Sequence, residues 1–262
     1  MSNRSSAFSL PIYLLIVFAF SWPFQIAFIL LGDDYRPLLL LSMLMVGVGT
    51  FVAGRYVFRD GFAHAGWRWG KPLHYVLVFV LALSLWLVPV ILEQAFGFRE
   101  FRGELLRWST ATIFLTSFLI TLAPAFAEEF SWRGYLLPRL LARHSRRTAL
   151  LLHGFATWLW HVPFILTIGF ELGGNSWTSV PLVLAVSLVP TVMHAVVFAW
   201  IWSSTGSLAV VTAYHAAFDE VRDTLEATVG FGALSENWQM VVLTILGAVL
   251  LWKANWKHRT RA

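Results

Sequence analysis

The sequence contains no cysteine, and it has few charged residues for its size. Of its 262 residues, 58% are hydrophobic and only 13% are charged. The absence of cysteine excludes disulfides, thiolate metal ligands and a cysteine nucleophile, so any chemistry must use other side chains. The fraction of charged residues is well below the range of soluble globular domains. The composition therefore predicts an integral membrane protein.

Apolar segments long enough to cross a bilayer recur along the whole chain. A spanning helix needs roughly 20 mostly apolar residues, and the candidates are residues 8–31, 37–57, 73–97, 110–142, 149–168, 178–202, 207–221 and 237–252. The seventh is short and runs into the polar sequence DEVRD. No polar stretch between the segments is long enough to fold separately. We therefore expect one integral membrane domain over residues 1–262, an all-α polytopic bundle of about eight transmembrane helices.

The basic residues are distributed unequally between the two predicted sides of the membrane. One side holds thirteen of them: Arg4, Arg55, Arg59, Arg68, Lys71, Arg139, Arg143, Arg146, Arg147, Lys253, Lys257, Arg259 and Arg261. The other side holds five: Arg36, Arg99, Arg102, Arg107 and Arg222. This asymmetry predicts a multi-pass protein of the cell membrane with both termini in the cytoplasm. The net charge of +5 then orients the protein in the lipid bilayer, and no nucleic-acid partner is indicated.

Ionisable side chains occur inside three of the apolar segments, where such residues are rare and by default mark function. They are Glu128, Glu129 and Arg133 in the fourth segment, His161 in the fifth, and His215 and Asp219 in the seventh. A helix rises about 1.5 Å per residue, which places Glu128, His161 and His215 roughly 21, 18 and 14 Å from the predicted cytoplasmic helix ends. These similar depths predict one shared intramembrane cavity, open to the cytoplasm.

The spacing within each segment suggests a role for each side chain. Glu129 and Arg133 are four residues apart, so they share a helix face and can form an ion pair. Glu128 points about 100° away around the helix and is free to act as a general base. Asp219 lies four residues after His215, where its carboxylate can orient the imidazole. Each group alone has a structural interpretation, as an ion pair or an interhelical hydrogen bond, and their joint occurrence favours a common site.

These residues resemble the motifs of the CPBP family, the CAAX-protease and bacteriocin-processing intramembrane endopeptidases, also called the Abi family. The family's two glutamates followed after three residues by arginine are matched in EEFSWRGYLLPRL, and its histidine close to a proline is matched in WLWHVPF. Its last motif, histidine, three residues, then asparagine or aspartate, is matched by HAAFD. The resemblance covers about residues 110–220. One departure is Thr157, where the family often has phenylalanine four residues before the histidine.

The resemblance implies an intramembrane endopeptidase similar to the Ras-converting CAAX prenyl endopeptidase. Glu128 would activate a water molecule, His161 would assist it, and His215 would stabilise the oxyanion, while Glu129, Arg133 and Asp219 would hold these groups in place. The family is commonly called metallo-, and a zinc ion on Glu128, His161 and His215 is chemically reasonable. A metal-free water activated by glutamate would use the same residues, and the sequence leaves both mechanisms open.

Two other classes of function remain open at this stage. One is a proton-coupled transporter with Glu128 as its protonation site, although no paired, interrupted halves typical of transporters are visible. The other is a non-catalytic membrane scaffold or immunity protein that binds through the same cavity. For an endopeptidase, the expected partner is a membrane-associated peptide or protein substrate, with or without a lipid group. His153 and His194, also in apolar segments, are expected to pack or to support the site from behind.

Overall fold

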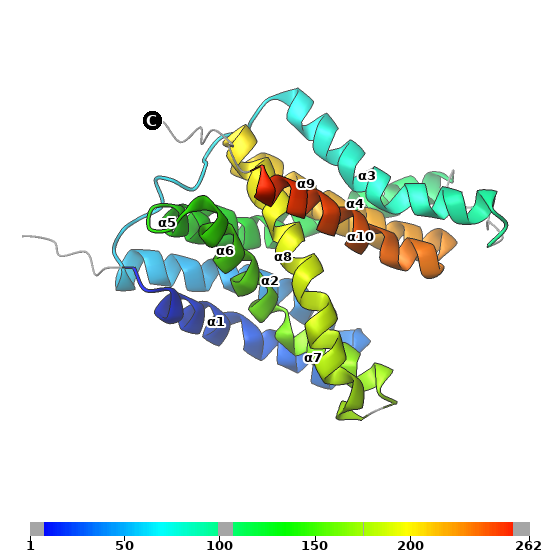
Figure 1. Cartoon of the computed structure of the whole chain (residues 1–262), viewed down its shortest axis with the longest axis horizontal. Coiled ribbons are helices and arrows are strands. Elements are labelled where there is room, and N and C mark those ends of the chain that lie inside the picture. The colour runs from blue at the N-terminus through cyan, green and yellow to red at the C-terminus, as the bar shows by residue number, and fades with distance from the viewer. Residues whose placement is uncertain (1–7, 99–106, 175, 254–262) are drawn as a thin grey trace, which may run out of the picture.

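The computed structural model describes residues 8–98, 107–174 and 176–253. In this part of the chain, all regular secondary structure is helical and there is no strand (Figure 1). The α-helices are α1 (Leu10–Leu31), α2 (Pro37–Val52), α3 (Pro72–Ala95), α4 (Trp108–Glu129), α5 (Leu137–Leu141), α6 (Arg146–Trp160), α7 (Val162–Leu172), α8 (Val180–Thr205), α9 (Leu208–Val229) and α10 (Ala233–Trp252). Two π-helices, η2 (Ala53–Val57) and η3 (Phe130–Leu136), extend α2 and α4, and the short 3₁₀ helices are η1 (Asp33–Tyr35) and η4 (Trp177–Ser179).

The all-α membrane fold predicted from the sequence is confirmed. Six helices in the described ranges are long and apolar enough to cross a membrane, and α6 with α7 makes a seventh if this pair, bent by 58°, is one span. All eight predicted segments are helical. The seventh corresponds to α9, which continues through the polar run to Val229 and is not among the six. Helix α9 packs between α3 and α4 in the bundle, which buries the first part of the helix, whereas Asp223 near its end is exposed.

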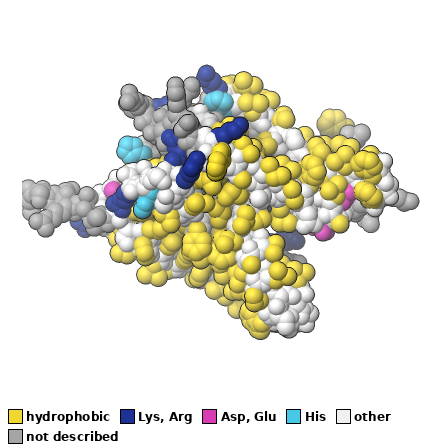
Figure 2. Space-filling model, viewed as in Figure 1, with side chains coloured by type: hydrophobic (Ala, Val, Ile, Leu, Met, Phe, Trp, Pro, Cys, Tyr) yellow, Lys and Arg dark blue, Asp and Glu magenta, His cyan; other side chains and the backbone are white. Residues whose placement is uncertain are grey.

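The bundle has two chemically different ends. Arg143 donates to the backbone oxygen of Phe8, and Arg147 donates to that of Trp252 at 2.8 Å, so the start of α1 and the end of α10 both lie beside the turn between α5 and α6. We call this the basic end. The opposite, far end carries the turns after α1, α3, α7 and α9 (Figure 1). Figure 2 shows Lys and Arg gathered at the basic end, carboxylates visible toward the far end, and a hydrophobic surface between them.

Residues 58–71, which connect η2 to α3, cover the basic end of α8 and α9. The indole of Trp202 donates to the backbone oxygen of Ala65 at 3.1 Å, and the backbone N–H of Leu208 donates to Gly66 at 2.8 Å. The hydroxyl of Ser207 donates to the backbone oxygen of Arg68. Ala65 is fully buried. These bonds fix the connecting segment as a packed cover over the turn between the two helices.

Small residues allow the helix backbones to approach closely, as is common where membrane helices pack. A Cβ atom placed on Gly47 of α2 would lie 2.8 Å from the Cβ of Ala127 on α4, and one on Gly247 of α10 would lie 2.4 Å from the backbone oxygen of Met193 on α8. The contact at Gly47 holds α2 directly against the turn of α4 that carries the two glutamates. The packing thus fixes where that turn lies.

Candidate active site

The two glutamates end α4, and the helix widens into a π-helix immediately after them. Glu128 and Glu129 are the last residues of α4, and Arg133 lies within η3. All three side chains are almost completely buried, with exposures of 3%, 0% and 2%. The predicted ion pair is present, because Nη1 of Arg133 lies 2.8 Å from Oε1 of Glu129. The guanidinium also lies over the ring of Phe198 at 4.0 Å, which holds it from a second side. Short π-helical segments are frequently found at functional sites.

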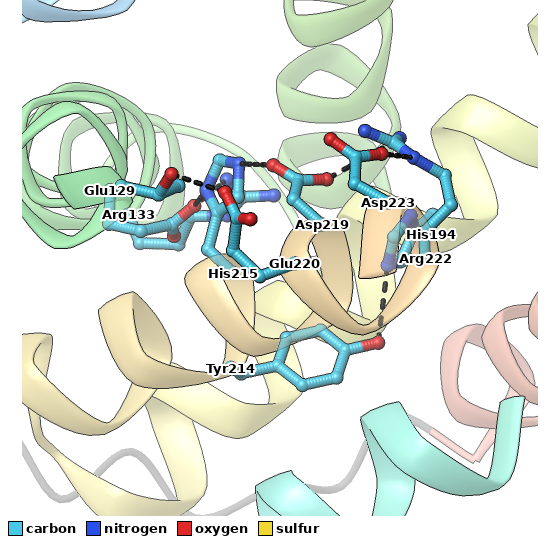
Figure 3. Close-up of polar contacts among 10 residues, drawn as sticks. Glu129, Arg133, His194, Tyr214, His215, Asp219, Glu220, Arg222 and Asp223 are labelled. Carbon is cyan, nitrogen blue, oxygen red and sulfur yellow. Dashed lines mark hydrogen bonds and ion pairs between the residues drawn. The ribbon is translucent and has the colours of Figure 1, made fainter. Parts of the chain in front are cut away.

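His215 on α9 is held between two carboxylates that come from different helices. Its Nδ1 lies 2.7 Å from Oε1 of Glu129, and its Nε2 lies 3.4 Å from Oδ2 of Asp219 (Figure 3). The Asp219 contact agrees with the spacing in the sequence. Because Oε1 of Glu129 accepts from both His215 and Arg133, Glu129 joins α4 to α9 at the site. This second contact is not visible from spacing within either helix.

His161 lies at the break between α6 and α7, where the chain bends by 58°. Its Nδ1 lies 2.8 Å from the backbone oxygen of Thr157. A carbonyl oxygen can only accept, so Nδ1 carries the proton and Nε2 of a neutral ring is left with a lone pair. Because the contact uses the backbone of Thr157, it does not depend on which side chain stands there. Pro163, next to the break, lacks the N–H that a continuous helix would need.

A single cavity of about 430 Å³ brings the predicted residues together. Its lining includes Glu128, Arg133, His161, His215 and Asp219. Oε1 of Glu128 is buried without a hydrogen-bond partner among the described residues. The sixth predicted residue, Glu129, lies behind this wall and contacts the cavity through His215 and Arg133. Side chains of α3, α7, α8, α9 and α10, most of them apolar, form the rest of the lining, so the charged groups converge in a largely apolar chamber, as in ligand sites generally.

Two ionisable residues of the cavity wall were not predicted as site residues, although His194 was expected to pack or to support the site from behind. His194 on α8 lines the cavity, and its Nε2 lies 3.2 Å from the hydroxyl of Tyr214. Arg222 lines it too, with Nη1 3.6 Å from Asp219 and Nε 2.6 Å from Asp223. Its position three residues after Asp219 places the two on one helix face, which is the signal that could have identified it. His153, by contrast, is fully buried and outside the cavity lining.

The arrangement of these side chains does not match a three-ligand metal site. Within the described ranges, no three His, Asp or Glu side chains are placed so that they could hold a metal ion. Both ring nitrogens of His215 face carboxylates, whereas a zinc ligand must present a free nitrogen to the metal. The zinc set of Glu128, His161 and His215 therefore stays a sequence prediction, and no step below passes through a metal.

Residues 110–221 match the family model described as type II CAAX prenyl endopeptidase Rce1-like. This segment is Rce1-like. The match spans less than half of the 262 residues, and it contains all six of the predicted site residues. The match confirms the resemblance to the CAAX-protease family over this segment. A comparison with curated proteins finds no match.

Proposed function

We propose that the Rce1-like segment hydrolyses a peptide bond inside the membrane with a water molecule activated by Glu128. One observation carries this proposal: Glu128, whose Oε1 has no hydrogen-bond partner among the described residues, lines the same cavity as His161 and His215. Hydrolysis of an amide needs a base, a positioned water and donors for the developing oxyanion. Three helices supply candidates for all three tasks at one chamber.

In the proposed reaction, Glu128 takes a proton from the water while the water oxygen attacks the peptide carbonyl carbon. Nε2 of His161 accepts a hydrogen bond from the same water and so orients it. The negative charge that develops on the carbonyl oxygen is stabilised by the N–H at Nε2 of His215. The C–N bond then breaks, and Glu128 returns its proton to the leaving amine. Atoms and charges balance, because one water is added across one peptide bond.

Glu129, Arg133 and Asp219 act as positioning residues in this scheme. Glu129 accepts from Nδ1 of His215 at 2.7 Å, which directs Nε2 of the ring toward Asp219 and the cavity. The 3.4 Å from Nε2 to Asp219 exceeds the usual hydrogen-bond range of about 2.7–3.2 Å. That N–H can therefore turn to a substrate oxygen without breaking a strong bond. Arg133 holds the Glu129 carboxylate in place through the 2.8 Å contact.

The substrate class follows from the surroundings of the site. The apolar cavity walls and the membrane helices around them favour a peptide segment that is itself associated with the membrane. The family description names a CAAX prenyl endopeptidase, so a prenylated C-terminal tail is one candidate, and a peptide without a prenyl group is the other. Both termini of the protein are proposed to lie in the cytoplasm, on the strength of the basic residues at that end.

The test is cleavage of a panel of membrane-associated peptides, with and without a farnesyl group, by purified protein in detergent or lipid. Glu128→Gln should slow cleavage by at least roughly 100-fold, the lower range for loss of a general base. Glu220→Gln is the matched control, because Glu220 is also a buried glutamate, bonded to Thr121 and absent from the cavity lining. A wild type that cleaves no peptide, or Glu128→Gln cleaving at the wild-type rate, would contradict the proposal and favour a transporter or a scaffold.

A further inference from the structure

The row of charged side chains that runs through the site becomes more exposed in one direction only. The row starts at the buried pair on α4 and η3 and continues along α9 toward the far end (Figure 3). The side-chain exposures are Glu129 0%, Arg133 3%, His215 12%, Asp219 23%, Arg222 39% and Asp223 50%. Charged groups exposed at membrane depth need water or lipid headgroups. The exposure of the charged row therefore increases toward the far end of α9.

The other direction along α9 is closed. Between His215 and the basic end, Leu208, Val210, Val211 and Tyr214 are all buried. Beyond them lies the cover of residues 58–71, held by its bonds to Trp202, Ser207 and Leu208. Ala65 of this cover would lie 3.2 Å from a Cβ on Gly134, the residue next to Arg133. The charged row is thus sealed at the basic end by close packing.

The cavity wall follows the same direction as the exposure. On α8 the lining residues are Ser187, Pro190, Thr191, His194, Ala195 and Phe198. Helix α8 starts at the far end and finishes at Thr205 beside the cover, so this lining spans the middle of the helix, from Phe198 beside the His215 ring to Ser187 nearer the far end. Gln239 and Leu243 in the middle of α10 also line the cavity. The chamber thus extends from the catalytic groups toward the far end.

We infer that the cavity is entered from the non-cytoplasmic side of the membrane. Of the thirteen Lys and Arg residues that the sequence assigns to the cytoplasmic side, the nine in the described ranges (all but Arg4, Lys257, Arg259 and Arg261) lie in segments at the basic end, so the positive-inside rule places this end in the cytoplasm and the far end outside. This inference rests on the proposed function. It implies that the substrates are peptides presented at the outer face of the membrane. It differs from the cytoplasm-facing opening that was expected from helix depth alone. A peptide that enters this way meets Asp223 and Arg222 before Asp219 and His215.

The absence of cysteine makes a direct test possible, because every introduced thiol is then a unique probe. Thr191→Cys reports on the cavity wall, Asp223→Cys on the exposed end of the charged row and His144→Cys on the exposed turn of the basic end. Ala217→Cys, at a fully buried position on α9, is the unreactive control. Sealed cells that express each variant are treated with a small, positively charged, membrane-impermeant methanethiosulfonate before and after permeabilisation.

We expect Asp223→Cys and Thr191→Cys to react in sealed cells, and His144→Cys to react only after permeabilisation. Reaction of Thr191→Cys only after permeabilisation would overturn the inference, as would a Thr191→Cys that never reacts or a His144→Cys that reacts in sealed cells. Labelling does not require proteolysis, so the result stands apart from the cleavage assay. If peptides are cleaved but Thr191→Cys is reached only from the cytoplasm, the proposed function survives and the direction of entry does not.

Discussion

The adjacent residues Glu128 and Glu129 should respond in opposite ways to the same isosteric change. Oε1 of Glu129 is bonded to both Arg133 and His215, and the ion pair of Glu129 with Arg133 is buried. Glu129→Gln removes the charge and leaves the guanidinium of Arg133 buried without its counter-ion, which costs about 3–5 kcal/mol when a buried pair is broken. Oε1 of Glu128 has no such partner in the described part of the chain. Glu128→Gln relieves a buried charge and should leave stability unchanged or slightly higher.

Thermal unfolding in detergent, measured in parallel with peptide cleavage, separates the two effects. We expect Glu129→Gln to lower the unfolding midpoint by roughly 6–20 °C, taking 2–4 °C per kcal/mol for a chain of this size. We expect Glu128→Gln to unfold like the wild type and to lose turnover. If Glu129→Gln unfolds at the wild-type midpoint, or Glu128→Gln is the less stable of the two, then the assignment of one glutamate to structure and the other to chemistry is refuted.

Three further predictions concern packing, capping and metal dependence. Gly247→Ala should destabilise the protein by about 1–3 kcal/mol, because the added Cβ would lie 2.4 Å from the backbone oxygen of Met193. Thermal unfolding measures this loss, with Ala248→Leu at the neighbouring exposed position as the control. Glu93→Gln should cost about 1–2 kcal/mol, because the Glu93 carboxylate caps α10 by accepting from the N–H groups of Leu234 and Ser235 at 2.8 and 3.1 Å; Gln94→Ala, at an exposed position, is its control in the same unfolding assay. Because both nitrogens of His215 face carboxylates, peptide cleavage should be insensitive to a chelator. A chelator-sensitive activity, together with stoichiometric zinc that is no longer bound in His161→Ala, would contradict the metal-free mechanism.

Much of the fold could be predicted from sequence because it depends on length and composition. Each of the eight apolar segments is helical, since a chain in lipid must satisfy its backbone hydrogen bonds internally. The ion pair between Glu129 and Arg133 could be predicted too, because four-residue spacing brings side chains together on any helix. The end of α9 was less predictable. Its polar residues resemble a loop in sequence, yet they continue the helix along the cavity.

The contacts between helices were not predictable in the same way. The bond from Glu129 to His215 joins residues 86 positions apart, and it depends on how α4 packs against α9. The sequence marks both residues but not their pairing. The direction in which the cavity opens could not be predicted from the sequence either. It is set by the cover over Ser207 and by the exposure of Arg222, neither of which leaves a periodic pattern.

The π-helix that follows Glu129 links the number of residues in this helix to the orientation of the side chains at the site. A π-helical turn accommodates a residue more than an α-helical turn does, and one residue corresponds to about 100° of rotation in an α-helix. That is also the angle between the neighbours Glu128 and Glu129. Deleting one residue between Phe130 and Leu136 would therefore turn one glutamate toward the place of the other without changing any side chain at the site. The two side chains are chemically identical, and the direction in which the helix points each of them determines its role.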